Sequence, residues 1–209
     1  MFPFRERKLN LDEKWFNSLK KDLEESYLRY NEPWKQAGFM LSEDAWLPCR
    51  RPIADCIQKS GNFLDIGCAN GYLLESILKW TSFDVTPFGI DLSPKLIELA
   101  KTRLSRYSNN LSVGSAPYWN SPVKFDYVRT DLSYALEDDQ EQYLHKVFTA
   151  YVAPEGKLLV TEYRSPKESP KTPWLNDKIE RWQINILDQK SGFYNGKELT
   201  RVLVLTRNT

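Results

Sequence analysis

Residues 63–71 read Phe-Leu-Asp-Ile-Gly-Cys-Ala-Asn-Gly, a short apolar run that ends in a glycine-rich turn. The pattern predicts a buried strand over 62–66, followed by a helix with Leu74, Ile77 and Leu78 on its inner face. Glycine lets a backbone approach a ligand closely, and amide groups at the start of a helix can point at that ligand. The stretch therefore predicts a strand-turn-helix unit that can hold a ligand.

Strand and helix patterns alternate beyond this stretch. One helix is predicted to begin at Ser93-Pro94, one to include residues 143–151, and one to begin at Pro173. The further strands are predicted over 87–91, 111–114, 125–129, 157–162 and 201–205. This alternation indicates βαβ units and a mainly parallel sheet. Asn195-Gly196 is a tight-turn signal, so we expect the chain to close with an antiparallel strand pair.

The first 45 residues have a different character. Apolar and aromatic residues recur there at helical spacing, namely at Phe16, Leu19, Leu23, Tyr27 and Tyr30. Pro33 is expected to end this helix, and Pro52 to open another that ends at Gly61. We expect residues 1–45 to form a helical arm or lid, and residues 46–209 to form one ligand-binding domain.

Bulk composition narrows the class of protein. The 209 residues carry 29 basic and 28 acidic side chains, so no polyanionic partner or anionic membrane surface is indicated. The three cysteines, Cys49, Cys56 and Cys68, are odd in number and unpatterned, so we expect no disulfide framework. The single histidine leaves few ligands for a metal ion, so we expect no metal site. We see no signal peptide and no apolar run of membrane-spanning length. We expect a cytoplasmic monomer or homodimer.

The spacing between the glycine-rich turn and a following acidic residue indicates the class of ligand. Asp91 follows Gly71 by about 20 residues, where a nucleotide-binding βαβ unit places an acid on ribose hydroxyls. Taken singly, the glycines could be turn residues and Asp91 a helix cap; at these offsets together they favour a nucleoside site. The turn reads Asp65-x-Gly67-x-Ala69-x-Gly71 instead of Gly-x-Gly-x-x-Gly. Its leading acid would repel a pyrophosphate but suits an ammonium, which favours S-adenosylmethionine over NAD.

Five segments in order resemble the motifs of the class I S-adenosylmethionine-dependent methyltransferases. They are residues 65–71, 89–93, 114–116, 125–128 and 154–158. The resemblance implies a Rossmann-like α/β fold: a three-layer αβα sandwich with a mainly parallel seven-stranded sheet and an antiparallel C-terminal strand. It also implies S-adenosylmethionine as cofactor and S-adenosylhomocysteine as product.

The same resemblance implies which residues contact the cofactor. Asp65 and Gly67 would face the methionine ammonium, and Asp91 the ribose hydroxyls. Leu92 would pack on the adenine, whose edge would meet the backbone of residues 115–116. The implied cofactor-binding residues are Asp65, Gly67, Cys68, Ala69, Gly71, Asp91, Leu92, Ser115, Ala116 and Thr130.

The chemistry is expected beside the stretch 129–134. Methyl transfer from a sulfonium is an in-line displacement, so orientation can supply most of the acceleration, and a base is needed only if the acceptor must lose a proton. Asp131 and Tyr134 are the candidate catalytic residues, and a loop cap or a rim position is the alternative for each. The stretch lacks the Asn/Asp-Pro-Pro-Tyr/Phe sequence of enzymes that methylate base amines, which lowers the nucleic-acid option.

The acceptor pocket is expected under the N-terminal arm and the loop after the fifth strand. We predict acceptor contacts from Tyr30, Trp34, Trp46 and Arg164; the alternative for the aromatic residues is a place in the core, which we favour for Tyr27. Arg50, Arg51 and Arg164 could hold an acidic acceptor, and a solvated charge is the alternative for each. The expected acceptor is a small molecule. The alternatives are a peptide, protein or RNA acceptor, or a non-catalytic cofactor-binding subunit.

Overall fold

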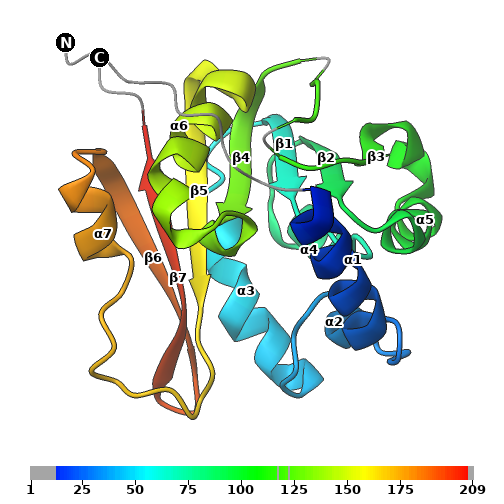
Figure 1. The fold of residues 1–209 in the computed structure, drawn as a ribbon, viewed down its shortest axis with the longest axis horizontal. Helices are drawn as coiled ribbons and strands as arrows, with labels where there is room; N and C mark the ends of the chain where they lie inside the picture. The colour runs from blue at the N-terminus through cyan, green and yellow to red at the C-terminus, as the bar shows by residue number, and fades with distance from the viewer. Residues whose placement is uncertain (1–12, 117, 122, 207–209) are drawn as a thin grey trace.

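A single seven-stranded sheet organises the protein (Figure 1). The computed structural model describes residues 13–116, 118–121 and 123–206, with side chains from residue 17 onward. The strands are β1 (Gly61–Ile66), β2 (Val85–Asp91), β3 (Leu111–Val113), β4 (Phe125–Asp131), β5 (Val152–Tyr163), β6 (Ile186–Tyr194) and β7 (Lys197–Leu205). Their order is β3-β2-β1-β4-β5-β7-β6, and β7 alone runs antiparallel to its neighbours. The predicted mainly parallel sheet with an antiparallel C-terminal strand is confirmed.

Helices cover both faces of the sheet. They are α1 (Glu13–Tyr27), α2 (Pro33–Gln36), α3 (Trp46–Ala54), α4 (Tyr72–Trp80), α5 (Pro94–Arg103), α6 (Gln140–Tyr151) and α7 (Asn176–Arg181), with short 3₁₀ turns η1 (Glu43–Ala45), η2 (Ser105–Asn110), η3 (Leu132–Tyr134) and η4 (Glu137–Asp139). Strand residues alternate between two cores. Phe63 faces the core built with α3, α4 and α5, whereas Leu64 faces the core built with α6 and α7. This is the expected three-layer sandwich.

Two prolines act differently from the prediction. The first helix ends at Tyr27, and Pro33 opens α2, where a residue without an amide proton is tolerated. Pro52 lies inside α3, which begins six residues earlier, at Trp46.

Two glycines have structural roles near α3. A Cβ atom at Gly192 would lie 2.7 Å from the carbonyl oxygen of Pro48, so glycine is needed for α3 to pack this closely on β6. Gly61 begins β1 instead of ending a helix.

The C-terminal strand pair forms as predicted. Asn195 and Gly196 join β6 to β7 with φ angles of 50° and 73°. Positive φ at both central residues is what a type I′ hairpin turn requires. The preceding helix α7 begins at Asn176, three residues after the predicted start at Pro173, and Ile186 begins β6.

The N-terminal region is tied to the domain by several contacts. Glu24 in α1 accepts a hydrogen bond from Ser93 Oγ (2.7 Å) and pairs with Lys95 Nζ (2.9 Å) at the start of α5. Phe39 and Ala45 are buried in the core of α3, α4 and α5. Residues 37–45 therefore pack with the domain, and the predicted boundary between residues 45 and 46 stays a prediction. The Phe16 side chain lies outside the described residues.

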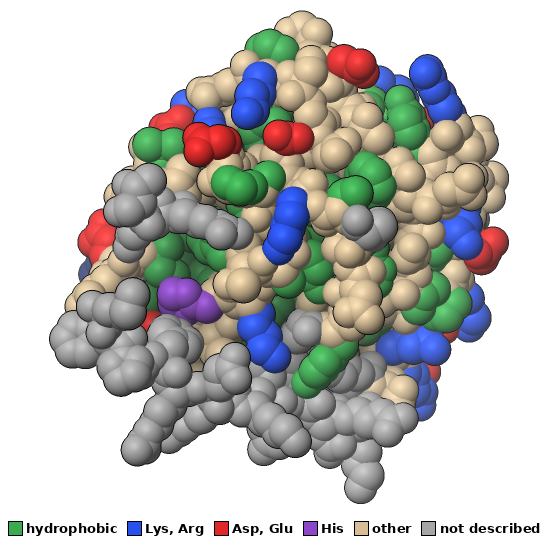
Figure 2. All heavy atoms as spheres, turned by 90° about the horizontal axis from the view of Figure 1, so that it is seen from above, with side chains coloured by type: hydrophobic (Ala, Val, Ile, Leu, Met, Phe, Trp, Pro, Cys, Tyr) green, Lys and Arg blue, Asp and Glu red, His purple; other side chains and the backbone are tan. Residues whose placement is uncertain are grey.

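The surface does not present a broad field of one charge on the face seen in Figure 2. Basic and acidic side chains are interspersed there with hydrophobic ones, among the residues that are described. Within residues 13–116, 118–121 and 123–206, no helix has the length and apolar character needed to cross a membrane. In the same part of the chain, no group of three or more His, Cys, Asp or Glu side chains is arranged to hold a metal ion.

Candidate functional site

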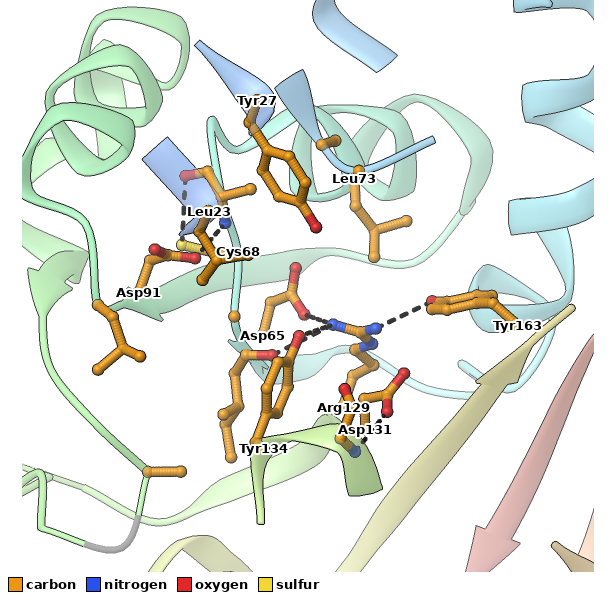
Figure 3. Close-up of a pocket in the computed structure, with 18 of the residues that line it drawn as sticks. Leu23, Tyr27, Asp65, Cys68, Leu73, Asp91, Arg129, Asp131, Tyr134 and Tyr163 are labelled. Carbon is orange, nitrogen blue, oxygen red and sulfur yellow. Dashed lines mark hydrogen bonds and ion pairs between the residues drawn. The ribbon is translucent and has the colours of Figure 1, made fainter. Parts of the chain in front are cut away.

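A cavity of about 330 Å³ lies at the carboxyl ends of the parallel strands (Figure 3). Ligands of open α/β sheets bind at this edge, and the volume falls in the range of small-molecule sites. Asp91, Asp65 and Arg129 enter it from the neighbouring strands β2, β1 and β4. Leu23 and Tyr27 of α1 line it from the other side. The cavity therefore combines acidic and basic groups beneath a helical cover.

The glycine-rich turn is held tightly at the end of β1. Gly67, Ala69 and Gly71 all have positive φ angles, of 75°, 47° and 73°. The amides of Gly67 and Cys68 both donate to the carbonyl oxygen of Ile90, at 2.8 and 3.0 Å. A Cβ atom at Gly67 would overlap the hydroxyl group and ring of Tyr134. Glycine is required there both by the backbone angle and by the space available.

Asp91 anchors this turn to β2. Its Oδ2 accepts from the amide of Ala69 (3.0 Å) and its Oδ1 from the amide of Ser93 (2.9 Å). Burial raises the pKa of Asp91 to about 6, although the amides of Ser93 and Ala69 favour the charged form. Each carboxylate oxygen can accept a second hydrogen bond. Because Asp91 also lines the cavity, it can accept hydroxyl groups of a ligand.

Asp65 has one oxygen paired and one unpaired. Its side chain is 1% exposed, and Oδ1 accepts from Arg129 Nη1 at 3.1 Å. Oδ2 is buried and has no hydrogen-bond partner among the described residues. Burial raises the pKa of Asp65, and Arg129 opposes that shift. An unpaired buried carboxylate oxygen is costly, so it is suited to receive a donor from a ligand, such as an ammonium group.

Arg129 connects Asp65 to the far wall of the cavity. Its Nη1 also donates to the carbonyl oxygen of Ile66 (3.2 Å), its Nη2 to Tyr163 Oη (3.0 Å) and its Nε to Thr161 Oγ1 (3.1 Å). The sequence analysis did not assign Arg129 a role. The sequence signal that could have found Arg129 is a charged residue inside a strand that is otherwise apolar. Because buried charges are normally paired, such a residue predicts an ion partner nearby.

The two candidate catalytic residues both lie at the cavity. Asp131 Oδ1 accepts from the amide of Ser133 (2.8 Å), so this side chain caps η3 as well as lining the cavity. The hydroxyl of Tyr134 lies 3.5 Å from Arg129 Nη1. Burial raises the pKa of Tyr134 well above its usual range, while the charge of Arg129 lowers it. The phenol of Tyr134 therefore stays protonated at neutral pH.

Most residues implied to contact the cofactor converge on this cavity. Of that set, Asp65, Gly67, Cys68, Ala69, Asp91, Leu92, Ser115 and Ala116 line it. Gly71 and Thr130 are not among the described lining residues. Gly71 is the N-cap of α4 and packs against α5, and Thr130 is buried with its hydroxyl bonded to Tyr143 of α6. Strand alternation turns Thr130 away from the face that carries Arg129.

Of the four residues predicted to contact the acceptor, one is among the described residues that line the cavity. Trp46 lines the cavity and donates from Nε1 to Ser76 Oγ (3.0 Å). Tyr30, Trp34 and Arg164 are not among the described lining residues. Lys35 lies over the ring of Tyr30, Trp34 packs on the core of α3 and α4, and Arg164 pairs with Glu162 and stacks on Trp174. The sequence analysis had placed Tyr27 in the core, and had not considered Leu23 or Tyr163 as cavity residues. Arg50, named there beside Arg51 for an acidic acceptor or as a solvated charge, lines the cavity.

Comparison with known proteins agrees with this geometry. Residues 57–206 match the family model described as a methyltransferase domain. The uncharacterized methyltransferase YdaC of Bacillus subtilis is 29% identical over 129 residues, which make up 61% of this chain and 69% of that protein.

Solved structures with a similar fold include two methyltransferases in complex with S-adenosylhomocysteine. The 1,6-didemethyltoxoflavin-N1-methyltransferase of Burkholderia thailandensis, which also holds 1,6-didemethyltoxoflavin, has a TM-score of 0.67 at 15% identity, covering 98% of this chain and 94% of that one. The N-methyltransferase NodS of Bradyrhizobium japonicum has a TM-score of 0.60 at 17% identity, covering 89% and 96%.

Proposed function

Since this chain belongs to the methyltransferase-domain family and is an S-adenosylmethionine-dependent enzyme, we propose that it methylates a small molecule bound in the cavity beside Asp131. The observation that carries the proposal is the unpaired Oδ2 of Asp65, one strand away from Asp91 in the same cavity. In the sheet Asp65 lies opposite Gly89, two residues before Asp91, so the two carboxylates can reach different polar groups of one ligand in the cavity.

The residues present fit the cofactor. Asp91 would accept the ribose hydroxyls, and Asp65 Oδ2 would accept the methionine ammonium. Leu92 and the backbone at Ser115 would border the adenine, in the same cavity. When bound, the cofactor supplies an electrophilic methyl group on a sulfonium with a good leaving group.

The chain's own residues then act by position. Asp131 has one oxygen engaged by Ser133 and a second that can take a proton from an acidic acceptor. Leu19 and Leu23 of α1 cover the cavity, which favours exclusion of water from the reacting atoms. Holding the acceptor in line with the methyl group supplies the larger part of the acceleration.

A small-molecule acceptor is supported by two observations. The cavity is of small-molecule size and is covered by α1. The near balance of 29 basic and 28 acidic side chains differs from the strongly basic character of most nucleic-acid-binding domains. A monomer or homodimer remains our proposal for the assembly.

Two measurements test the function. S-adenosylmethionine and S-adenosylhomocysteine should both raise the melting temperature of the protein, whereas NAD should not, because only a ligand of the folded state stabilises it. Purified protein should then release S-adenosylhomocysteine when given the correct metabolite fraction. Release with a peptide or RNA fraction instead would replace the small-molecule acceptor, and a shift with NAD alone would refute the cofactor.

A further inference from the structure

Arg50, in α3, is a buried cation without an acidic partner. Its side chain is 7% exposed, and no carboxylate among the described residues lies within ion-pair distance of it. Its guanidinium donates one hydrogen bond within the described part of the chain, to Thr200 Oγ1 at 3.4 Å. A guanidinium carries five N–H donors, and a buried charge normally has an ion partner. Arg50 therefore keeps N–H donors that no described residue is seen to accept, beside the cavity that it lines.

Aromatic rings hold this cation in place. Its Cζ lies 3.7 Å from the ring centre of Tyr163, 4.7 Å from Phe39 and 5.3 Å from Trp46. Rings stabilise a cation through their faces but offer no strong acceptor to its N–H groups. Burial lowers the pKa of Arg50, yet arginine stays charged in proteins. The site is thus a fixed positive charge with donors still to satisfy.

The position of Arg50 relates it to the acceptor. It lines the same cavity as Asp65 and Asp91, but it contacts Tyr163 of β5 and Thr200 of β7. In the sheet the order is β2, β1, β4, β5, β7, so Arg50 lies on the opposite side of Asp65 from Asp91. In Figure 3, Arg129 lies between Asp65 and Tyr163.

We propose that Arg50 binds a carboxylate in this cavity. A guanidinium and a carboxylate form two parallel charge-assisted hydrogen bonds, which would satisfy donors that the protein leaves free. Two ligands can bring the carboxylate: the acceptor, or the methionine tail of the cofactor. Methionine carries its carboxylate on the same carbon as its ammonium, beside Asp65, so the strand order favours the acceptor. This inference rests on the proposed function.

The first test needs no variant. Benzoate and hexanoate are added to the protein saturated with S-adenosylhomocysteine, each compared with its neutral amide. Both carboxylates should raise the melting temperature and the amides should not, because only the carboxylates pair with Arg50. Equal effects of acids and amides would overturn the acceptor as the source of the carboxylate. Failure of S-adenosylhomocysteine itself to bind would instead overturn the proposed function.

The second test uses variants with a matched control. Arg50→Met removes the charge at similar length, Arg50→Lys retains it, and Arg51→Gln removes the neighbouring exposed charge that pairs with Asp55 at 2.8 Å. Arg50→Met should abolish the response to benzoate, with Arg50→Lys partly and Arg51→Gln fully retaining it. A folded Arg50→Met protein that responds like the wild type overturns the inference.

Calorimetry distinguishes the two sources of carboxylate. If the acceptor brings it, Arg50→Met should bind S-adenosylhomocysteine within about twofold of the wild type. A loss of about tenfold or more, with unchanged binding of 5′-methylthioadenosine, would support the carboxylate site but assign it to the cofactor, because that nucleoside lacks the amino-acid tail.

Discussion

Replacing Asp91 with alanine should weaken the binding of S-adenosylhomocysteine at least tenfold. The carboxylate gives one lone pair of each oxygen to the amides of Ala69 and Ser93, which leaves one on each oxygen for the ribose. A hydrogen bond to a charged group contributes about 1.5–3 kcal/mol. With about 1.4 kcal/mol per tenfold, one lost bond predicts about tenfold weaker binding, and two lost bonds about a hundredfold or more.

The same substitution also affects the fold, and the assay has to separate the two effects. Without Asp91 the amides of Ala69 and Ser93 lose their acceptors, so the turn after β1 is loosened. Calorimetric titration should therefore be made well below the melting temperature, after circular dichroism has verified the fold. Asp84→Ala, at an exposed acid just before β2, is the matched control for charge. Unchanged affinity in folded Asp91→Ala protein would refute the assignment of Asp91 to the ribose.

Three further perturbations address the turn, the titration and the cover. Gly67→Ala should lower the free energy of unfolding in urea by about 1–2 kcal/mol because of the left-handed backbone, and further because the new Cβ overlaps Tyr134. Adding Tyr134→Ala should recover the part of the loss that comes from the overlap. A Gly67→Ala protein as stable as the wild type would contradict this prediction. The ribose hydroxyls donate to the charged form of Asp91, and burial raises the pKa of this carboxyl to about 6. The affinity for S-adenosylhomocysteine should therefore fall by up to about tenfold per pH unit below pH 6. Asp91→Ala should not show this fall. Deleting residues 1–31 should leave a folded protein that releases S-adenosylhomocysteine faster, because Leu23 and Tyr27 no longer cover the cavity; an unfolded product would mean that α1 belongs to the core.

The cofactor site could be predicted from the sequence because it is local. The residues from Asp65 to Gly71 form one continuous turn, and Asp91 lies one βαβ unit further along. Strand length and helix length fix that separation, so spacing along the chain translates directly into position in space. The closing hairpin at Asn195 and Gly196 was predictable for the same reason, since its turn type depends on two adjacent residues.

The acceptor side depends on contacts between distant segments. Arg164, the first residue of the predicted loop after β5, pairs with Glu162 and stacks on Trp174 and is not among the described residues that line the cavity. Tyr27 was expected in the core and instead lines the cavity.

Arg129 and Asp65 are separated by 64 residues in the chain, and their ion pair arises because β1 and β4 become neighbours in the sheet. Sequence spacing alone carries no information about such a pair, since it follows from strand order. Arg50 is the clearest case: beside Arg51 it reads as one of two similar charges, and packing alone buries the first among aromatic rings while the second pairs with Asp55 at the surface. The sequence by itself determined the fold and the cofactor, and tertiary packing decided which charges face the acceptor.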